Sequence, residues 1–178
     1  MTTQTRIIIG LGNPDKTYQN TRHNVGKQFL GYLAGEGSWE TNKKIKAEII
    51  KKDSLVLARP LVFMNQSGEA VKNIVGFYKA EIKNVLVVHD DSDLIFGKIK
   101  FAQPESSSAG HHGIESIERV LGKKKFARIR LGIRPEKSST KALGFVLKKF
   151  GKKDLEILEK EIFPKAKEIL IEWWGKGE

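Results

Sequence analysis

The sequence RIIIGLG, residues 6–12, is an apolar run rich in β-branched side chains that ends at a glycine and leads directly into the polar residues NPDKTY. A short apolar run bounded by turn-forming residues is typical of a buried β-strand. The stretch therefore predicts a strand in the interior of the protein, with a cluster of polar side chains at its carboxyl end.

Three other segments have the pattern of strands or hairpins. AEIIKKDSLVLARP (47–60) predicts a hairpin that turns near Asp53 and Ser54 and closes at Pro60. NVLVVHDD (84–91) predicts another buried strand that ends in polar residues, and FARIRLGIR (126–134) alternates between apolar and basic residues.

Helices are expected between and after these strands. QSGEAVKNIVGFYK (66–79) places apolar residues at helical spacing, and so does the stretch from Ile114 to Leu121. A longer apolar stripe runs from Leu155 to Trp173 and is interrupted by Pro164, which predicts a kink or two consecutive helices.

The alternation of strands and helices indicates an α/β protein. We expect a single domain over residues 1–178, with a twisted, mixed, mostly parallel sheet flanked by helices on both faces. Ligands of such sheets bind at the carboxyl ends of the strands. Three polar clusters are expected there: GNPDKTY, FMNQSG and HDDSD.

Composition limits the classes of function. The chain has 178 residues, of which 39% are hydrophobic and 30% charged, as in a globular protein with a sizeable core. It has no cysteine, which excludes disulfide scaffolds, thiol nucleophiles and cysteine metal sites. No apolar run is long enough to span a membrane, and MTTQT lacks the apolar core of a signal peptide. A cytoplasmic protein without a membrane partner is expected.

The net charge of +11 indicates a polyanionic partner. Basic residues cluster in GKKKFARIR (122–130) and KKFGKK (148–153). Either cluster alone is explained by a solvated helix end or loop. The excess over the whole chain favours a nucleic acid.

A histidine in the polar segment YQNTRHNVG (18–26) is a candidate base. His23 has no apolar neighbour before Val25, so we expect a wet imidazole near its usual pKa of about 6.5. Asp90, at the end of a buried strand, could accept the imidazole N–H and stabilise the charged ring. The alternative for Asp90 is a loop or helix cap.

Asn65 and Ser67 precede the helix expected at 66–79, so one of them is expected to cap it. The Asn65 amide could instead point into the site and donate to an oxyanion.

Two other kinds of site are not expected. GLGNPD (10–15) resembles a dinucleotide fingerprint only superficially, because Pro14 breaks the turn-to-helix geometry, and a tight turn explains it. The aspartates of HDDSD with His111 and His112 match no common metal spacing, so no metal is expected.

The segments IIGLGNPDKTYQNTRHNVG, RPLVFMNQSGEAV, VVHDDSDLIFGKIKF, GHHGIESI and FARIRLGI resemble, in order and approximate spacing, those of bacterial peptidyl-tRNA hydrolases. The resemblance covers roughly residues 6–150. It implies an enzyme that cleaves the ester between peptide and tRNA, that needs no cofactor and no metal, and that acts as a monomer with tRNA as its partner.

The resemblance also implies roles for individual residues. His23 would be the general base and Asp90 the carboxylate that orients it. Asn13 would contact the peptide backbone of the substrate. The other residues implied in substrate binding are Tyr18, Phe63, Met64, Asn65 and His112, and those implied in tRNA binding are Lys98, Lys100, Arg128 and Arg130.

Three departures from the family pattern concern substrate contacts. His112 stands where the family commonly has an asparagine, the loop PESSSAG is one residue longer, and Ala102 replaces a basic residue. His112 could replace the amide, or it could cap the following helix or face solvent. Two alternatives to the enzyme remain: a non-catalytic RNA-binding relative resembling an organellar splicing cofactor, and a nucleotide-binding enzyme.

Overall fold

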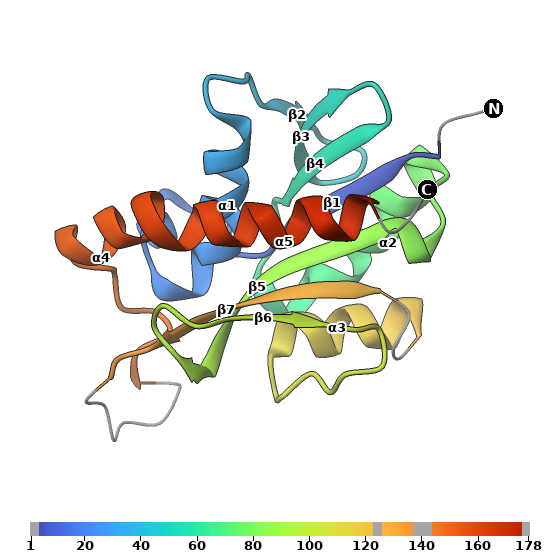
Figure 1. Cartoon of the computed structure of the whole chain (residues 1–178). Helices are drawn as coiled ribbons and strands as arrows, with labels where there is room; N and C mark the ends of the chain where they lie inside the picture. The colour runs from blue at the N-terminus through green and yellow to red at the C-terminus, as the bar shows by residue number, and fades with distance from the viewer. Residues whose placement is uncertain (1–3, 123–125, 137–143, 176–178) are drawn as a thin grey trace.

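The computed structural model of the chain describes residues 4–122, 126–136 and 144–175, in which seven strands form one mixed sheet (Figure 1). Its order is β2-β3-β4-β1-β5-β7-β6. The strands are β1 (Arg6–Gly10), β2 (Glu40–Asn42), β3 (Ala47–Lys52), β4 (Leu55–Pro60), β5 (Val85–Ile95), β6 (Ile99–Ala102) and β7 (Ala127–Arg134). The central strands β4, β1, β5 and β7 are parallel, whereas the pairs β2–β3, β3–β4 and β6–β7 are antiparallel. The predicted α/β class is confirmed.

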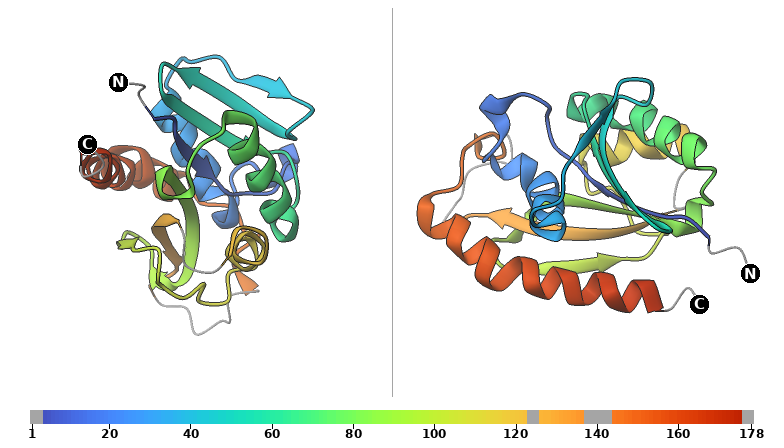
Figure 2. Two further views of the ribbon diagram at one scale, coloured as in Figure 1. Left: turned by 90° about the vertical axis from the view of Figure 1, so that its right-hand side faces the viewer. Right: turned by 90° about the horizontal axis from the view of Figure 1, so that it is seen from above.

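Helices cover both faces of the sheet, as predicted. α1 (Val25–Ala34) packs with the C-terminal helices on one face, while α2 (Ser67–Tyr78) and α3 (His112–Leu121) pack on the other. Figure 2 shows the C-terminal helix on the opposite side of the sheet from α2 and α3. The run Ile7–Ile9 alternates between these two apolar clusters and is fully buried. In the part of the chain that the structure describes, no helix is both long and apolar enough to cross a membrane.

Pro164 divides the C-terminal apolar stripe into consecutive helices, as predicted. α4 (Lys152–Ile157) leads through a π-helical turn (Leu158–Ile162) into α5 (Phe163–Gly175). Proline has no N–H, and its ring crowds the carbonyl four residues earlier, which is that of Lys160. The wider π turn before Pro164 accommodates this, and the helix continues along the sheet.

The hairpin turn was correctly predicted, whereas three elements were not. Asp53 turns the β3–β4 hairpin with a φ of 52°. The helix α1 was missed because its sequence holds two glycines, which lower helix propensity. The strands β2 and β6 were missed because they are short and lie at the two edges of the sheet.

Two glycines let α1 start directly against the sheet. A Cβ on Gly10 would lie 2.4 Å from the carbonyl oxygen of Gly26, and one on Gly26 would lie 2.3 Å from that of Val88. Any larger residue would push the helix away. The segment before α1, which contains His23, is thereby held at the carboxyl end of β1 and beside the middle of β5.

Candidate active site

His23 and Asp90 form a hydrogen-bonded pair beside the middle of β5, which continues past the predicted strand end to Ile95. His23 lies in a 3₁₀ turn, η2 (Arg22–Asn24), and its Nδ1 is 2.8 and 2.9 Å from the two carboxylate oxygens of Asp90. An ionised carboxylate only accepts hydrogen bonds, so Nδ1 carries the proton and Nε2 is left with its lone pair. The sequence prediction that these two residues meet is confirmed.

The segment 146–150 holds His23 from the other side. The N–H of His23 donates to the carbonyl of Val146, and the N–H of Arg22 donates to that of Lys148. The Arg22 guanidinium lies over the ring of Phe150 at 4.8 Å and pairs with Asp154 at 3.0 Å. The backbone of the candidate base is therefore fixed by main-chain bonds.

His111, which the sequence analysis did not assign to the catalytic centre, is a second partner of Asp90. Its Nε2 lies 2.8 Å from the Asp90 oxygen that also contacts His23. Its Nδ1 caps α3 by accepting from the N–H groups of Gly113 and Ile114. Because Nδ1 is an acceptor, Nε2 must carry the proton and donate it to Asp90. The signal in the sequence was a polar residue directly before a helix, but His112 was considered as the cap instead.

Charges in this cluster shift the pKa values of both members of the pair. Burial alone would raise the pKa of Asp90, but attraction and hydrogen bonds from His23 and His111 hold that pKa well below its usual range. Burial alone would lower the pKa of His23, but the Asp90 charge and hydrogen bond raise it overall. The expectation of a wet, unperturbed His23 was wrong, because its side chain is only 15% exposed and contacts a buried carboxylate.

Asn13 is held by a second asparagine that sequence reasoning missed. Asn24 accepts from the Asn13 N–H and donates to the Asn13 carbonyl, both at 2.9 Å. The Asn13 side-chain oxygen accepts from the Met64 N–H at 2.9 Å. With its oxygen so engaged, Asn13 is oriented to offer its amide N–H groups. The signal for Asn24 was its place next to His23.

The geometry agrees with the comparisons to known proteins. Residues 7–178 match the family model described as Peptidyl-tRNA hydrolase. This chain belongs to the peptidyl-tRNA hydrolase family.

Individual family members are similar over most of the chain. A peptidyl-tRNA hydrolase of Clostridium perfringens strain SM101 is 37% identical over 171 residues, which cover 93% of this chain and 89% of the relative. The chloroplastic peptidyl-tRNA hydrolase of Arabidopsis thaliana is 43% identical over 86% of this chain and 55% of its own length. The crystal structure of the Acinetobacter baumannii peptidyl-tRNA hydrolase superimposes with a TM-score of 0.75 at 27% identity and covers 93% of this chain and 94% of that one.

Two of the residues assigned to substrate binding by resemblance to peptidyl-tRNA hydrolases form an aromatic pair. The rings of Tyr18 and Phe63 meet edge to face at 6.4 Å, and Phe63 is 46% exposed. Asn65 is exposed in the 3₁₀ turn η3 (Met64–Gln66). His112 is exposed as the first residue of α3.

The Met64 segment packs more tightly and corrects the capping prediction. Met64 is buried, and a Cβ on Gly113 would lie 2.6 Å from its sulfur. Neither Asn65 nor Ser67 caps α2: Gln66 stands at the cap position, and the Ser67 hydroxyl donates to the Met64 carbonyl at 2.7 Å. Met64 therefore lies between the Asn13 loop and the start of α3.

The basic residues assigned to tRNA differ in exposure. Lys98 and Lys100 are exposed at the β6 edge, and Lys100 is paired in register with Arg130 of β7. Arg130 has an exposed fraction of 18% and lies 2.6 Å from the Asp91 carboxylate. Arg128 is placed differently: it is 1% exposed, and its Nη2 donates to the carbonyls of Ser106 and Ser107, at 2.8 and 2.9 Å. The structure thus gives Arg128 the role of holding the 103–111 loop rather than a surface contact. Residues 123–125 of the basic cluster lie outside the described residues.

Proposed function

We propose that this chain hydrolyses the ester bond of peptidyl-tRNA, with His23 as the general base and Asp90 as the residue that orients it. The observation that carries the proposal is the bond from His23 Nδ1 to buried Asp90, because it fixes the ring tautomer whose Nε2 can accept a proton. The family match supports the reaction. The test is release of peptide from an N-blocked aminoacyl-tRNA. A non-catalytic RNA-binding relative would bind this substrate without cleaving it.

The proposed reaction needs one water molecule and no covalent intermediate. His23 Nε2 takes a proton from water as the water oxygen attacks the ester carbonyl. The amides of Asn13 and Asn65 donate to the oxyanion that forms. The C–O bond to the ribose then breaks, and the His23 imidazolium returns its proton to the ribose oxygen. Asp90 stabilises the imidazolium between these two steps.

The remaining residues assigned by resemblance complete the proposed binding site. Asn13 contacts the peptide backbone, and Tyr18, Phe63, Met64, Asn65 and His112 line the path of the substrate. Lys98, Lys100 and Arg130 contact tRNA phosphates. We further propose that the chain acts as a single-domain monomer in the cytoplasm.

Replacing both Lys98 and Lys100 by alanine should weaken tRNA binding and make it less sensitive to salt. Each phosphate contact that is lost removes nearly one unit from the slope of log affinity against log salt, so the slope should fall by up to about two. Affinity for tRNA is measured over a series of salt concentrations. The control changes Lys43 and Lys44, which lie near β2 at the opposite edge of the sheet. Equal slopes for the two double variants would show that Lys98 and Lys100 do not contact tRNA phosphates.

Removal of metal ions should leave hydrolysis unchanged. His23, Asp90 and His111 bring three possible ligand atoms within 4.8 Å of one another. However, His111 Nδ1 is bonded to two backbone N–H groups, so its Nε2 holds a proton rather than a lone pair for a metal. Dialysis against a chelator is followed by the hydrolysis assay. A loss of activity that a divalent cation restores would show that these residues bind a metal.

Changing His111 to asparagine should separate its two roles. Asparagine is among the best N-caps, so α3 should keep its stability. The shorter side chain cannot also reach Asp90, so the carboxylate loses one of its two imidazole donors, and hydrolysis should fall roughly tenfold. His111→Ala should add a stability loss of about 1 kcal/mol from the missing cap. Thermal unfolding and initial rates measure the two effects, and full activity of His111→Asn would mean that the bond to Asp90 has no catalytic consequence.

A further inference from the structure

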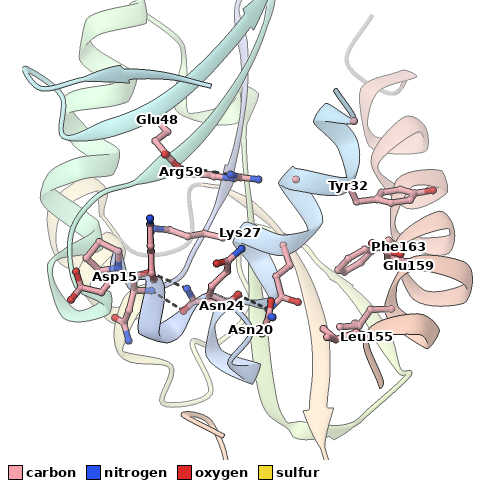
Figure 3. A pocket seen from close by; sticks show the side chains of 18 of the residues that line it. Asp15, Asn20, Asn24, Lys27, Tyr32, Glu48, Arg59, Leu155, Glu159 and Phe163 are labelled. Carbon is pink, nitrogen blue, oxygen red and sulfur yellow. Dashed lines mark hydrogen bonds and ion pairs between the residues drawn. The ribbon is translucent and has the colours of Figure 1, made fainter. Parts of the chain in front are cut away.

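A cavity of about 1070 Å³ lies along α1 and is bordered by the loop of Asn13, Pro14 and Asp15. Its walls are the exposed side of α1, the β3–β4 hairpin and the helical segment 155–163 (Figure 3). His23, Asp90 and His111 do not line it. The cavity therefore does not contain the His23–Asp90 pair, although Asn13 and Asn24 line it and connect it to the proposed catalytic centre.

Two cations on one wall lack close anionic partners. Lys27 projects from α1, and its Nζ is 3.4 Å from the carbonyl of Asn13, which is a long hydrogen bond. Arg59 comes from β4 and lies with its guanidinium 3.8 Å from the ring centre of Trp39. The Arg59 Nη1 is 3.9 Å from the carboxylate of Glu48, and its buried Nε has no hydrogen-bond partner among the described residues.

The charges at this wall do not balance. Lys27 is in none of the ion pairs found within residues 4–122, 126–136 and 144–175, so Glu48 faces two cations. Burial lowers the pKa of Lys27 to about 8, the charge of Glu48 opposes this shift, and the charge of Arg59 adds to it. Other charged residues of the lining, Asp15, Lys16, Glu156, Glu159 and Lys160, are exposed and screened by solvent. The part of the cavity around Lys27, Arg59 and Glu48 thus has a net positive charge of one, which a monoanion would neutralise.

The opposite side of the cavity carries apolar and aromatic side chains next to the exposed Glu156, Glu159 and Lys160. Figure 3 shows Tyr32, Leu155 and Phe163 across from Lys27 and Arg59. The rings of Tyr32 and Phe163 lie 5.5 Å apart. A cavity with a few convergent polar groups and an apolar wall suits a small molecule with a polar head and an apolar body.

We propose that this cavity binds a small organic monocarboxylate, with its carboxylate between Lys27 and Arg59 and its apolar body against Tyr32 and Leu155. The carboxylate accepts from the Lys27 ammonium and from the Arg59 guanidinium, including its unpartnered Nε–H. A dianion such as a phosphate monoester would meet repulsion from Glu48. Because Lys27 also contacts the Asn13 carbonyl, a ligand bound to Lys27 is connected through it to Asn13.

The test measures binding of 3-phenylpropionate and of its uncharged amide to the full chain by isothermal titration calorimetry. We expect the carboxylate to bind with a Kd on the order of 1 mM or tighter. The amide should bind at least about tenfold more weakly, because it cannot form charge-assisted hydrogen bonds. This comparison uses the unaltered protein and does not depend on hydrolysis. Equal binding of the two probes, or no binding of either, would overturn the proposal.

A variant then locates the site. Lys27→Met keeps most of the side-chain volume and removes a partly buried ammonium, so it should fold at least as stably as the parent chain. It should weaken 3-phenylpropionate binding about tenfold. Lys46→Met is the matched control, since Lys46 is exposed and pairs with Glu69. The NMR signal of the Arg59 Nε–H should also move with the carboxylate and not with the amide. Unchanged affinity in Lys27→Met, or an unmoved Arg59 signal, would place the probe elsewhere.

Discussion

Replacing His23 by alanine should reduce hydrolysis of peptidyl-tRNA by about 10²–10⁴-fold, the usual contribution of a general base. Affinity for tRNA should stay nearly unchanged, because the proposed phosphate contacts lie on β6, directly before it, and on β7. The fold should tolerate the change, since Asp90 keeps its bond from His111 at 2.8 Å. Single-turnover rates and tRNA binding are measured on the same preparations.

The control for this variant is Gln19→Ala in the same polar segment. Gln19 is exposed, and the described hydrogen bonds in which it takes part involve its backbone N–H and carbonyl. It should retain both binding and hydrolysis. A loss of less than tenfold in His23→Ala would mean that another group takes the proton from water. A parallel loss of tRNA affinity would mean that His23 binds substrate instead.

The catalytic pair was predictable from the sequence because its members follow directly from two recognisable apolar runs. The run at 6–12 and the run at 84–91 are parallel neighbours in the sheet, so the residues after them meet at one edge. Asp90 occupies the end of the second run, and His23 is brought to it by the short connection through Asn13. What the sequence does not contain is the distance between the two side chains, and therefore the direction in which the His23 pKa is shifted.

Other features depend on packing that no local pattern encodes. Arg128 and Arg130 alternate with apolar residues, which suggested a basic surface. The strand β7 is an interior strand, and loop 103–111 covers Arg128 and accepts its hydrogen bonds. His111 was missed because its role needs the residue directly before α3 to lie beside the middle of β5. Sequence spacing alone could not distinguish it from His112.

Asp90→Asn should lower hydrolysis by at least about 100-fold while preserving the fold. The amide oxygen can still accept from His23 and His111, but the amide nitrogen then occupies the position 2.9 Å from His23 Nδ1. An N–H facing Nδ1 favours the tautomer with the proton on Nε2, which is the nitrogen that must accept the proton from water. The charge that stabilises the imidazolium is also lost.

The pH dependence of hydrolysis by Asp90→Asn distinguishes these effects from a general loss of folded protein. In the parent chain Asp90 raises the His23 pKa, so the neutral base forms only above a midpoint that lies higher than about 6.5, and the rate falls as pH drops through it. Without the carboxylate, burial lowers the His23 pKa, and the acid-side midpoint should move to lower pH while the plateau rate falls. Asp93→Asn, an exposed position on the same strand, is the control and should change neither quantity. A profile for Asp90→Asn with the parent midpoint would show that Asp90 does not set the protonation of the base, whatever its effect on the rate.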